Sequence, residues 1–502
     1  MVEDNALTQA AARFEAGDLA LADTLVERIL AAAPEHAEAL QLKARLLLRQ
    51  RQPGAAAQVL QRVVALRPDA VDVWIDLGRA HNNDGRLAAA CEAFGRAAEL
   101  DPGNADAWAF RGHALRGLGQ LDEAAVAFDE ALLRDESHLR ALKGLGSVQL
   151  ALGHPGKAAA ALKRAVAANP GDADAYAYLG AALHRSADPE GAEAAYREAL
   201  SRNPRHGEAW LNLGITLQDT GRLAGAIEAY RQTTVIQPRS TLALNRLADA
   251  QLAAGHSGEA LQTTSACLAA DPGNSAALAA RALALNELGR DAEAHAMLDY
   301  RHLVRPLDIR APAGFADVAA FNAALREHVL SHPSLSYEPE GHATRGGRHT
   351  GDLLDGEMGP VAVLEGIVLE AAARYVRELG TAARDFVRAL PPRPRLAMWA
   401  VVMDTEGYQL PHIHPAAMLS GVYYVDLPAS IGAGDEDVAG WIEFGLPPED
   451  IHLKRPPPVA LQRPVEGRLF LFPSYFYHRT IPFPGAERRI CIAFDVLRPV
   501  AA

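Results

Sequence analysis

Cysteine is scarce in this sequence of 502 residues, which contains only Cys91, Cys267 and Cys491. They lie far apart and form no Cys-x-x-Cys pair, which excludes a disulfide framework and a zinc site built from thiolates. Basic residues are also too few for a general nucleic-acid-binding protein, because 49 Lys and Arg face 62 Asp and Glu and leave a net charge of −13. The sequence lacks the apolar run of about 18 residues that a membrane span needs, and its acidic N-terminus lacks signal-peptide features. We therefore predict a cytoplasmic protein that binds neither nucleic acid nor membrane.

A repeat of 34 residues dominates the first three fifths of the chain. Each unit contains two apolar segments of helical periodicity around a Gly-bearing turn, and a proline stops the second helix. Prolines recur at Pro34, Pro68, Pro102, Pro170, Pro204, Pro238, Pro272 and Pro306, with Glu136 in the missing slot. Glycines recur in two series, Gly78, Gly112, Gly146, Gly180 and Gly214, and then Gly85, Gly119, Gly153, Gly221, Gly255 and Gly289.

This pattern resembles the tetratricopeptide repeat and covers residues 4–308 in about nine units. We expect the first glycine series to let the two helices of a unit approach closely. The resemblance implies an all-α, right-handed superhelix whose inner surface is lined by the first helix of each unit and holds a peptide or protein. The sequence leaves open which side chains of that surface bind the partner.

The composition changes at Ile309, where the repeat ends. Residues 315–333 and 359–390 have helical patterns, a polar Gly-rich stretch around 343–354 separates them, and Pro391, Pro392 and Pro394 break the second helix. Runs rich in Val, Ile and aromatic residues then follow, bounded by Gly and Pro as strands are, at 396–403, 421–428, 440–444, 467–473 and 488–497. We predict an α+β multidomain chain: the repeat superhelix in 1–308, a helical region in 309–395 that packs on a barrel, and a double-stranded β-helix of jelly-roll or cupin-like type in 396–502.

Three histidines in the strand-rich part indicate a metal site. His412 and His414 are two positions apart, so both imidazoles point to the same side of an extended segment. His478 follows the predicted strand at 467–473. An early pair and a late single histidine can converge at the mouth of a barrel and leave metal positions open for a bidentate co-substrate and O2, as in non-haem Fe(II) oxygenases.

The segments HIHPAAMLSGVYY and FPSYFYHR, in this order, resemble motifs of the Fe(II)/2-oxoglutarate-dependent dioxygenases, and the resemblance covers roughly Ile309 to the C-terminus. It implies Fe(II) held by His412 and His478, with 2-oxoglutarate and O2 as co-substrates. The chain departs from the common His-x-Asp/Glu pattern, because His414 stands where the carboxylate ligand would be. The third ligand is therefore either His414 or a carboxylate elsewhere, and the two alternatives for the latter are Asp426 and Glu443.

The same resemblance requires an Arg or Lys on the strand after the last histidine, to pair with the far carboxylate of 2-oxoglutarate. Arg488 and Arg489 both stand there. Side chains alternate along a strand, and Arg489 shares its face with the small residues Cys491 and Ala493, which leave room for a cavity. We therefore predict that Arg489 binds the co-substrate. Three hydroxyl-bearing residues near the motifs are further candidates for contact with the co-substrate, namely Tyr424, Ser420 and Tyr408.

These features together predict an Fe(II)/2-oxoglutarate-dependent dioxygenase that hydroxylates a peptide or protein side chain recruited by the repeats. Because the bound cofactor carries the chemistry, no catalytic side chain beyond the metal centre is predicted. Two alternatives remain open: a repeat scaffold with an inactive oxygenase-like barrel, and a three-histidine non-haem iron oxygenase that does not use 2-oxoglutarate. The sequence does not identify the substrate, the hydroxylated residue or the oligomeric state.

Overall fold

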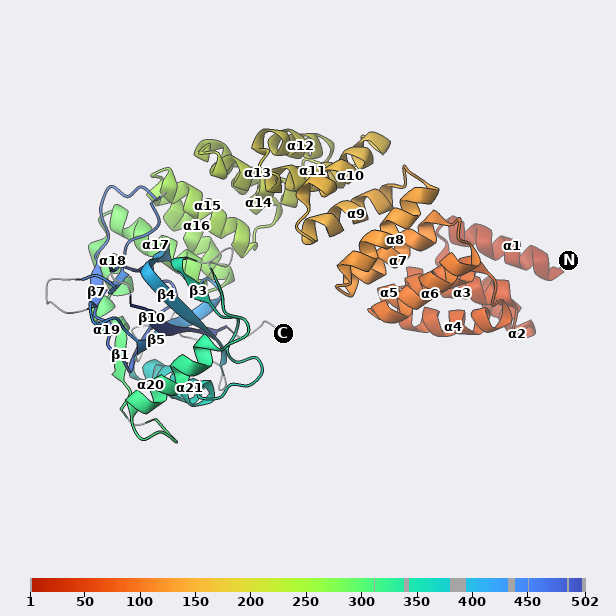
Figure 1. The fold of residues 1–502 in the computed structure, drawn as a ribbon. Coiled ribbons are helices and arrows are strands. Elements are labelled where there is room, and N and C mark those ends of the chain that lie inside the picture. The colour runs from red at the N-terminus through yellow and green to blue at the C-terminus, as the bar shows by residue number, and fades with distance from the viewer. Residues whose placement is uncertain are drawn as a thin grey trace. The chain divides into compact units, whose positions relative to one another are not determined.

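The structure, a computed structural model, describes residues 2–310, 312–337, 343–379, 394–431, 438–449, 451–484 and 487–498. They form two compact units, Met1–Thr216 and Leu217–Ala502. Stacked helical repeats come first in the chain and a curled antiparallel β-sheet follows, which confirms the predicted α+β multidomain class (Figure 1). No helix within these ranges is long and apolar enough to cross a membrane.

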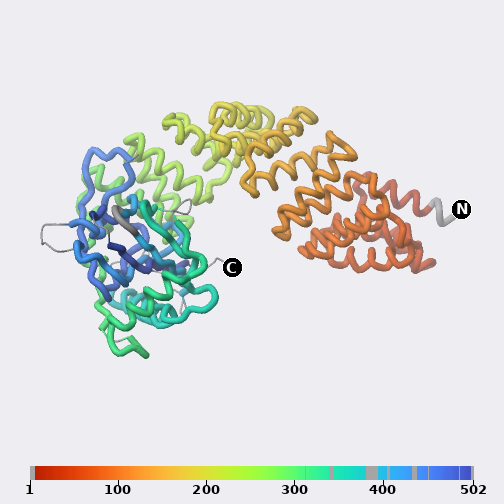
Figure 2. The backbone as a smooth tube through the Cα atoms, in the orientation of Figure 1, coloured from red at the N-terminus to blue at the C-terminus, as the bar shows by residue number. Residues whose placement is uncertain are grey.

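Helical hairpins make up the first unit and continue into the second (Figure 2). The first unit contains α1 (Val2–Glu15), α2 (Leu19–Ala32), α3 (Ala37–Arg49), α4 (Pro53–Leu66), α5 (Val71–Asn83), α6 (Leu87–Leu100), α7 (Ala105–Gly117), α8 (Leu121–Arg134), α9 (Leu139–Ala151), α10 (Pro155–Ala168), α11 (Ala173–Arg185) and α12 (Pro189–Arg202). Helix α13 (Gly207–Asp219) spans the boundary, and α14 (Leu223–Ile236), α15 (Thr241–Ala253), α16 (Ser257–Ala270), α17 (Ser275–Glu287) and α18 (Asp291–Met297) belong to the second unit.

The turn between the two helices of each hairpin accounts for the second glycine series. One turn residue per hairpin has a positive φ, which glycine adopts without a steric penalty. Arg51 and Ala187 take the same conformation, so the 34-residue phase is kept at the two turns that lack glycine. This conformation costs a non-glycine residue roughly 1–2 kcal/mol. The described turn residues with positive φ are Gly17, Arg51, Gly85, Gly119, Gly153, Ala187, Gly221, Gly255 and Gly289.

The repeat also determines how the helices pack and where they begin. A Cβ atom on Gly78 would lie 2.5 Å from the Phe94 ring, so this glycine is needed for the close helix contact that the first glycine series predicts. Helix-capping residues recur with the same period. Asn104, Asp172 and Asn274 are separated by multiples of 34 residues, and each accepts a hydrogen bond of 3.0 Å from the backbone N–H three residues later.

A curled antiparallel sheet forms the centre of the second unit. Its described strands follow the order β1-β8-β5-β10-β4-β9-β6-β7, and β3 pairs with β4 and β2 with β3. The strands are β1 (Arg305–Asp308), β2 (Ser336–Tyr337), β3 (Thr344–His349), β4 (Arg395–His412), β5 (Ala417–Asp426), β6 (Ile442–Phe444), β7 (Ala460–Gln462), β8 (Arg468–Pro473), β9 (His478–Thr480) and β10 (Arg489–Leu497). Helices α19 (Tyr300–Leu303), α20 (Val318–Leu330) and α21 (Val361–Leu379) complete the unit.

The predicted strands and helices of this unit are present, with one addition. Strands β4, β5, β6, β8 and β10 overlap the runs predicted as strands, and α20 and α21 lie in the segments predicted as helices. The Gly-rich stretch between these helices contains β3, which sequence patterning does not reveal because it lacks alternating apolar residues. Gly347 lies so close to β4 that a Cβ atom would be 3.0 Å from the Val402 carbonyl oxygen. The predicted continuation of the second helix to residue 390, with Pro391 and Pro392, lies outside the described residues.

The hydrophobic core of the second unit includes residues that precede Ile309. The ring of Tyr300 lies 4.7 Å from that of Phe476 in an edge-to-face contact, and β1 pairs with β8. The Ser275 hydroxyl of α17 donates to the carbonyl of Ala417 at 2.7 Å. The predicted domain boundaries at residues 308 and 395 remain predictions. The hydrophobic core of the second unit already includes residues of the last helical hairpin.

Candidate metal centre

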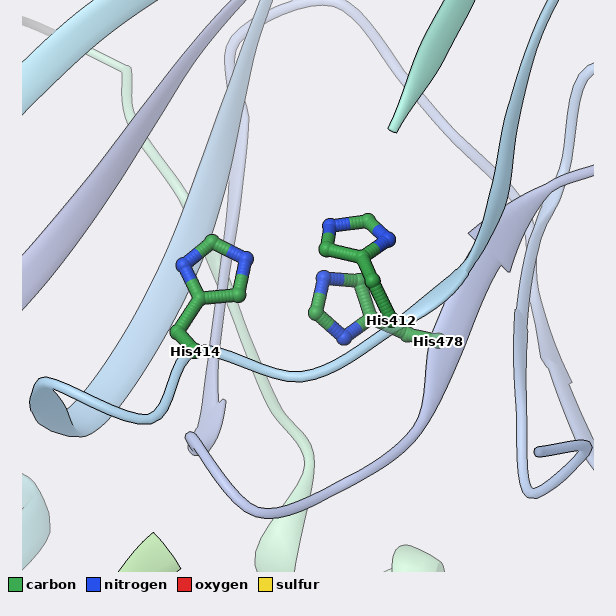
Figure 3. A group of neighbouring side chains, drawn as sticks. All are labelled: His412, His414 and His478. Carbon is green, nitrogen blue, oxygen red and sulfur yellow. The ribbon is translucent and has the colours of Figure 1, made fainter. Parts of the chain in front are cut away.

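Three histidines from neighbouring elements converge on one space (Figure 3). His412 ends β4, His478 begins β9, and the two face each other in the β4–β9 pairing. His414 lies two residues further on, in the connection to β5. Ring centroids are 4.3 Å apart for His412 and His478, and His414 is 5.2 Å from each of them. One nitrogen of each ring lies within 4.8 Å of the others, which is a suitable spacing for a shared metal ion.

Hydrogen bonds at Nδ1 fix the tautomer of all three rings. His412 and His478 lie 2.8 and 2.9 Å from the carbonyl oxygens two residues before them, and His414 lies 2.8 Å from Oδ1 of Asp495. These oxygens accept hydrogen bonds, so each Nδ1 donates and each Nε2 keeps its lone pair. Nε2 of His414 is buried and has no hydrogen-bond partner among the described residues. The site therefore fits a divalent transition metal that takes nitrogen ligands.

The surroundings of the rings favour the neutral form that binds metals. Removal from water, together with the neighbouring His414 ring, lowers the pKa of His412 to about 4. Burial also lowers the pKa of His478 well below its usual value, with the other two rings acting in the same direction. Protons therefore compete weakly with a metal at these two nitrogens near neutral pH.

A buried arginine lies in the same cavity, which has a volume of about 270 Å³. Arg489 is 1% exposed, whereas Arg488 is exposed at the surface. The guanidinium lies 5.3 Å from the centre of the Tyr424 ring, and its Nη1 lies 3.7 Å from the sulfur of Met403. Among the residues that the structure describes, its Nε has no hydrogen-bond partner and no carboxylate forms an ion pair with it. A buried cation without a counter-ion is costly, so the cavity is suited to an anionic ligand.

Two family models match this chain, one in the helical repeats and one in the part that forms the sheet. Residues 397–495 match the family described as "Putative 2OG-Fe(II) oxygenase". The tetratricopeptide repeat model matches residues 7–70, 42–105, 111–173, 143–188 and 183–240. The chain contains a tetratricopeptide-repeat region and a 2OG-Fe(II) oxygenase-family domain. The family implies Fe(II) and 2-oxoglutarate, and the three-histidine cluster lies within the matched residues.

Solved structures resemble parts of this tetratricopeptide-repeat oxygenase-family protein. A crystal structure of MamA is 28% identical, with 32% of this chain and 94% of that chain covered and a TM-score of 0.31. The structure of the APC/C hetero-tetramer Cut9-Hcn1 is 20% identical, with 53% and 52% covered and a TM-score of 0.40. YrrB, described as a TPR protein with an unusual peptide-binding site, is 24% identical, with 38% and 97% covered and a TM-score of 0.33. No curated protein matches the chain.

The predicted co-substrate residues of the oxygenase-family domain occupy different positions around the cavity. Tyr424 lines it, and burial raises the pKa of its phenol to about 12. Ser420 is buried, and its hydroxyl donates to Oδ1 of Asp495 at 2.6 Å. Tyr408 is half-buried and is not among the residues that line the cavity. Among these three, only Tyr424 lines the cavity, and the roles of all three remain predictions.

Neither alternative carboxylate lies at the three-histidine cluster of the oxygenase-family domain. Asp426 forms an ion pair of 3.2 Å with Arg326 of α20. Glu443 of β6 forms an ion pair with Arg479 of β9. Neither residue is among those that line the cavity, whereas His414 is.

The oxygenase-family domain also has site residues that are not among those predicted. Asp495 contacts His414, and the Trp399 ring stacks near His414 at 5.7 Å between centroids. Asp495 lies on the face of β10 that carries Arg489, so strand alternation could have placed its side chain on the cavity side, but not beside His414. On β3, β4 and β9, hydrogen bonds link the side chains of His349, Thr344, Gln409 and Thr480 into a polar wall of the cavity.

Proposed function

We propose that this protein is an Fe(II)/2-oxoglutarate-dependent hydroxylase that modifies a peptide or protein side chain bound by its repeats. One observation carries the proposal: a three-imidazole cluster lines the same cavity as a buried arginine that has no counter-ion among the described residues. A metal that binds neutral imidazoles and a dianion such as 2-oxoglutarate would complement both groups. Bound Fe(II), with 2-oxoglutarate and O2, would supply the oxidation that side-chain acid–base groups cannot.

The residues of the cavity have separate tasks in this proposal. His412, His414 and His478 hold the metal through Nε2. Arg489 binds the far carboxylate of 2-oxoglutarate, since a guanidinium can donate two parallel hydrogen bonds to a carboxylate. Tyr424 packs against that guanidinium and limits its movement. The small side chains that follow Arg489 on its face of β10 leave space for the co-substrate.

The buried arginine also bears on the two alternatives. An oxygenase that uses O2 without an oxo-acid has no need of a cation in its cavity, and an unpaired buried charge lowers the stability of the fold. An inactive barrel likewise has no reason to keep Nε2 of His414 buried without a hydrogen-bond partner in the described part of the chain. Both observations support the 2-oxoglutarate-dependent reaction over the alternatives.

The first unit offers a surface for the peptide part of the proposal. A cavity of about 470 Å³ is lined by residues of α7, α9 and α11, the first helices of successive hairpins. Arg116, Arg140, Lys143 and Tyr178 are among its lining residues. These side chains can donate hydrogen bonds to the backbone and the acidic side chains of a peptide, which supports peptide binding there. The cytoplasmic location stays a prediction.

Turnover of the co-substrate tests the proposed activity without knowledge of the substrate. Full-length protein reconstituted with Fe(II) is incubated with 2-oxoglutarate and O2, and succinate is quantified by mass spectrometry. We expect slow succinate formation that stops in His478→Ala and continues in Arg488→Met, whose side chain lies outside the cavity. An iron-loaded wild-type protein that forms no succinate would contradict the proposal.

A further inference from the structure

Asp495 lies in contact with His414 and is largely buried, at 8% exposure. Its Oδ1 accepts two hydrogen bonds, from Nδ1 of His414 at 2.8 Å and from the Ser420 hydroxyl at 2.6 Å. A carboxylate held by two donors at one oxygen has little freedom to move. Its position therefore determines the orientation of the His414 ring.

The neighbouring strands hold this arrangement in place. Asp495 of β10 lies directly opposite Ser420 of β5 in the strand register. The Ser420 hydroxyl gives its hydrogen to Asp495 and lies 2.8 Å from the hydroxyl of Ser474, which is fully buried and follows β8. The carbonyl of Ser474 accepts the backbone N–H of His414 at 3.1 Å. One buried cluster thus holds both the main chain and the ring of this histidine.

In the described part of the chain, one group near Asp495 can balance its charge. Among the described residues, the only ion pair of Asp495 is with His414. That ring must donate from Nδ1 to the carboxylate, and within the described ranges its other nitrogen has no hydrogen-bond partner. A buried carboxylate next to a neutral ring is costly unless a positive charge lies beyond the ring. Nε2 of His414 faces the point where a metal would provide that charge.

We propose that Asp495 is a positioning residue that orients His414 for metal binding and supplies the negative charge that three neutral imidazoles lack. The inference rests on the proposed function only in assuming that the three-histidine cluster binds a divalent metal. A carboxylate that accepts the second N–H of a ligating histidine fixes the ring and makes its free nitrogen more basic. His414 and Asp495 together thus replace a directly bound carboxylate. The net charge of the ligand set is the same, but the carboxylate lies one imidazole ring further from the metal site.

Metal affinity tests the inference independently of turnover. The full-length protein is titrated anaerobically with Co(II), and binding is followed by calorimetry and by the visible ligand-field spectrum. Asp495→Asn keeps the shape and an oxygen that can accept the His414 hydrogen, but it removes the charge. Asp495→Ala removes both. Asp426→Asn is the matched control, since Asp426 is a partly buried, ion-paired aspartate outside the cavity.

We expect Asp495→Asn to weaken Co(II) binding by about 10-fold or more, and Asp495→Ala to weaken it further and alter the Co(II) spectrum. The control should bind Co(II) like the wild type, and the variants should keep the wild-type circular dichroism without metal. If Asp495→Ala does not fold, Asp495→Asn decides the question. Wild-type affinity in Asp495→Asn would overturn the inference. Failure of the proposed function looks different, because the wild type would then bind Co(II) but not 2-oxoglutarate.

Discussion

Replacing Arg489 with methionine should separate co-substrate binding from metal binding. Methionine is apolar and of similar length, so it fills most of the space of the buried side chain while removing its charge. The three histidines are held by backbone carbonyls and by Asp495, not by Arg489. We therefore expect Arg489→Met to bind Fe(II) like the wild type and to lose affinity for 2-oxoglutarate.

The structure gives the size of the effect. Arg489 is 1% exposed and has no described anionic partner, so a 2-oxoglutarate carboxylate would form a fully desolvated charge pair with it. Removing one partner of such a pair typically costs about 2–5 kcal/mol. Since each 1.4 kcal/mol corresponds to about tenfold in Kd, the Kd for 2-oxoglutarate should rise by roughly 30-fold or more. Without ligand the variant should be at least as stable as the wild type, because an uncompensated buried charge is removed.

Anaerobic calorimetry of the Fe(II)-loaded protein with 2-oxoglutarate measures this change. Arg488→Met is the matched control, since Arg488 is the neighbouring arginine and is exposed. The control should bind 2-oxoglutarate like the wild type. Equal affinity of Arg489→Met and wild type would refute the reasoning and favour an oxygenase that does not use 2-oxoglutarate.

The remaining predictions concern the metal ligands and the extent of the folded unit. His412→Ala and His478→Ala should each abolish iron binding while keeping the wild-type circular dichroism; iron content after reconstitution measures this, and wild-type occupancy in either variant would exclude that ligand. His414→Ala should lower iron affinity by about 10-fold or more, whereas His414→Asp should keep iron by restoring the common ligand pattern; full succinate formation by the alanine variant would remove His414 from the site. A fragment that begins at Ile309 should be insoluble, because it loses β1 and core residues of the last hairpin, whereas one that begins at Gly207 should remain soluble and bind iron; a soluble, iron-binding fragment from Ile309 would contradict this view of the core.

Much of this fold could be predicted because its determinants are local or periodic. The 34-residue spacing arises from a turn with positive φ and from close contacts between two helices, and both features lie within one repeat. Strand alternation likewise indicates that Arg489 and not Arg488 points inward, since neighbouring side chains must face opposite sides of the sheet. The structure has Arg489 in the cavity and Arg488 at the surface.

The features that escaped prediction depend on contacts between distant residues. Asp495 contacts His414 across 81 positions of sequence, and only the pairing of β10 with β5 and the connection after β4 brings them together. Strand β3 lacks an apolar pattern because polar residues of this strand, Thr344 and His349, are buried and hydrogen-bond to each other at 2.6 Å. In both cases the role of the residue follows from the side chain that it contacts in the folded protein, and the local sequence does not show that contact.

The central claim is that one cavity holds a metal on three histidines and 2-oxoglutarate on Arg489. Anaerobic addition of 2-oxoglutarate to the Fe(II)-reconstituted full-length protein tests it most directly. The account predicts a visible metal-to-ligand charge-transfer band that saturates with 2-oxoglutarate in the wild type, is missing in His478→Ala, and needs far higher concentrations in Arg489→Met. An iron-loaded wild-type protein that shows no such band at saturating 2-oxoglutarate would contradict the account.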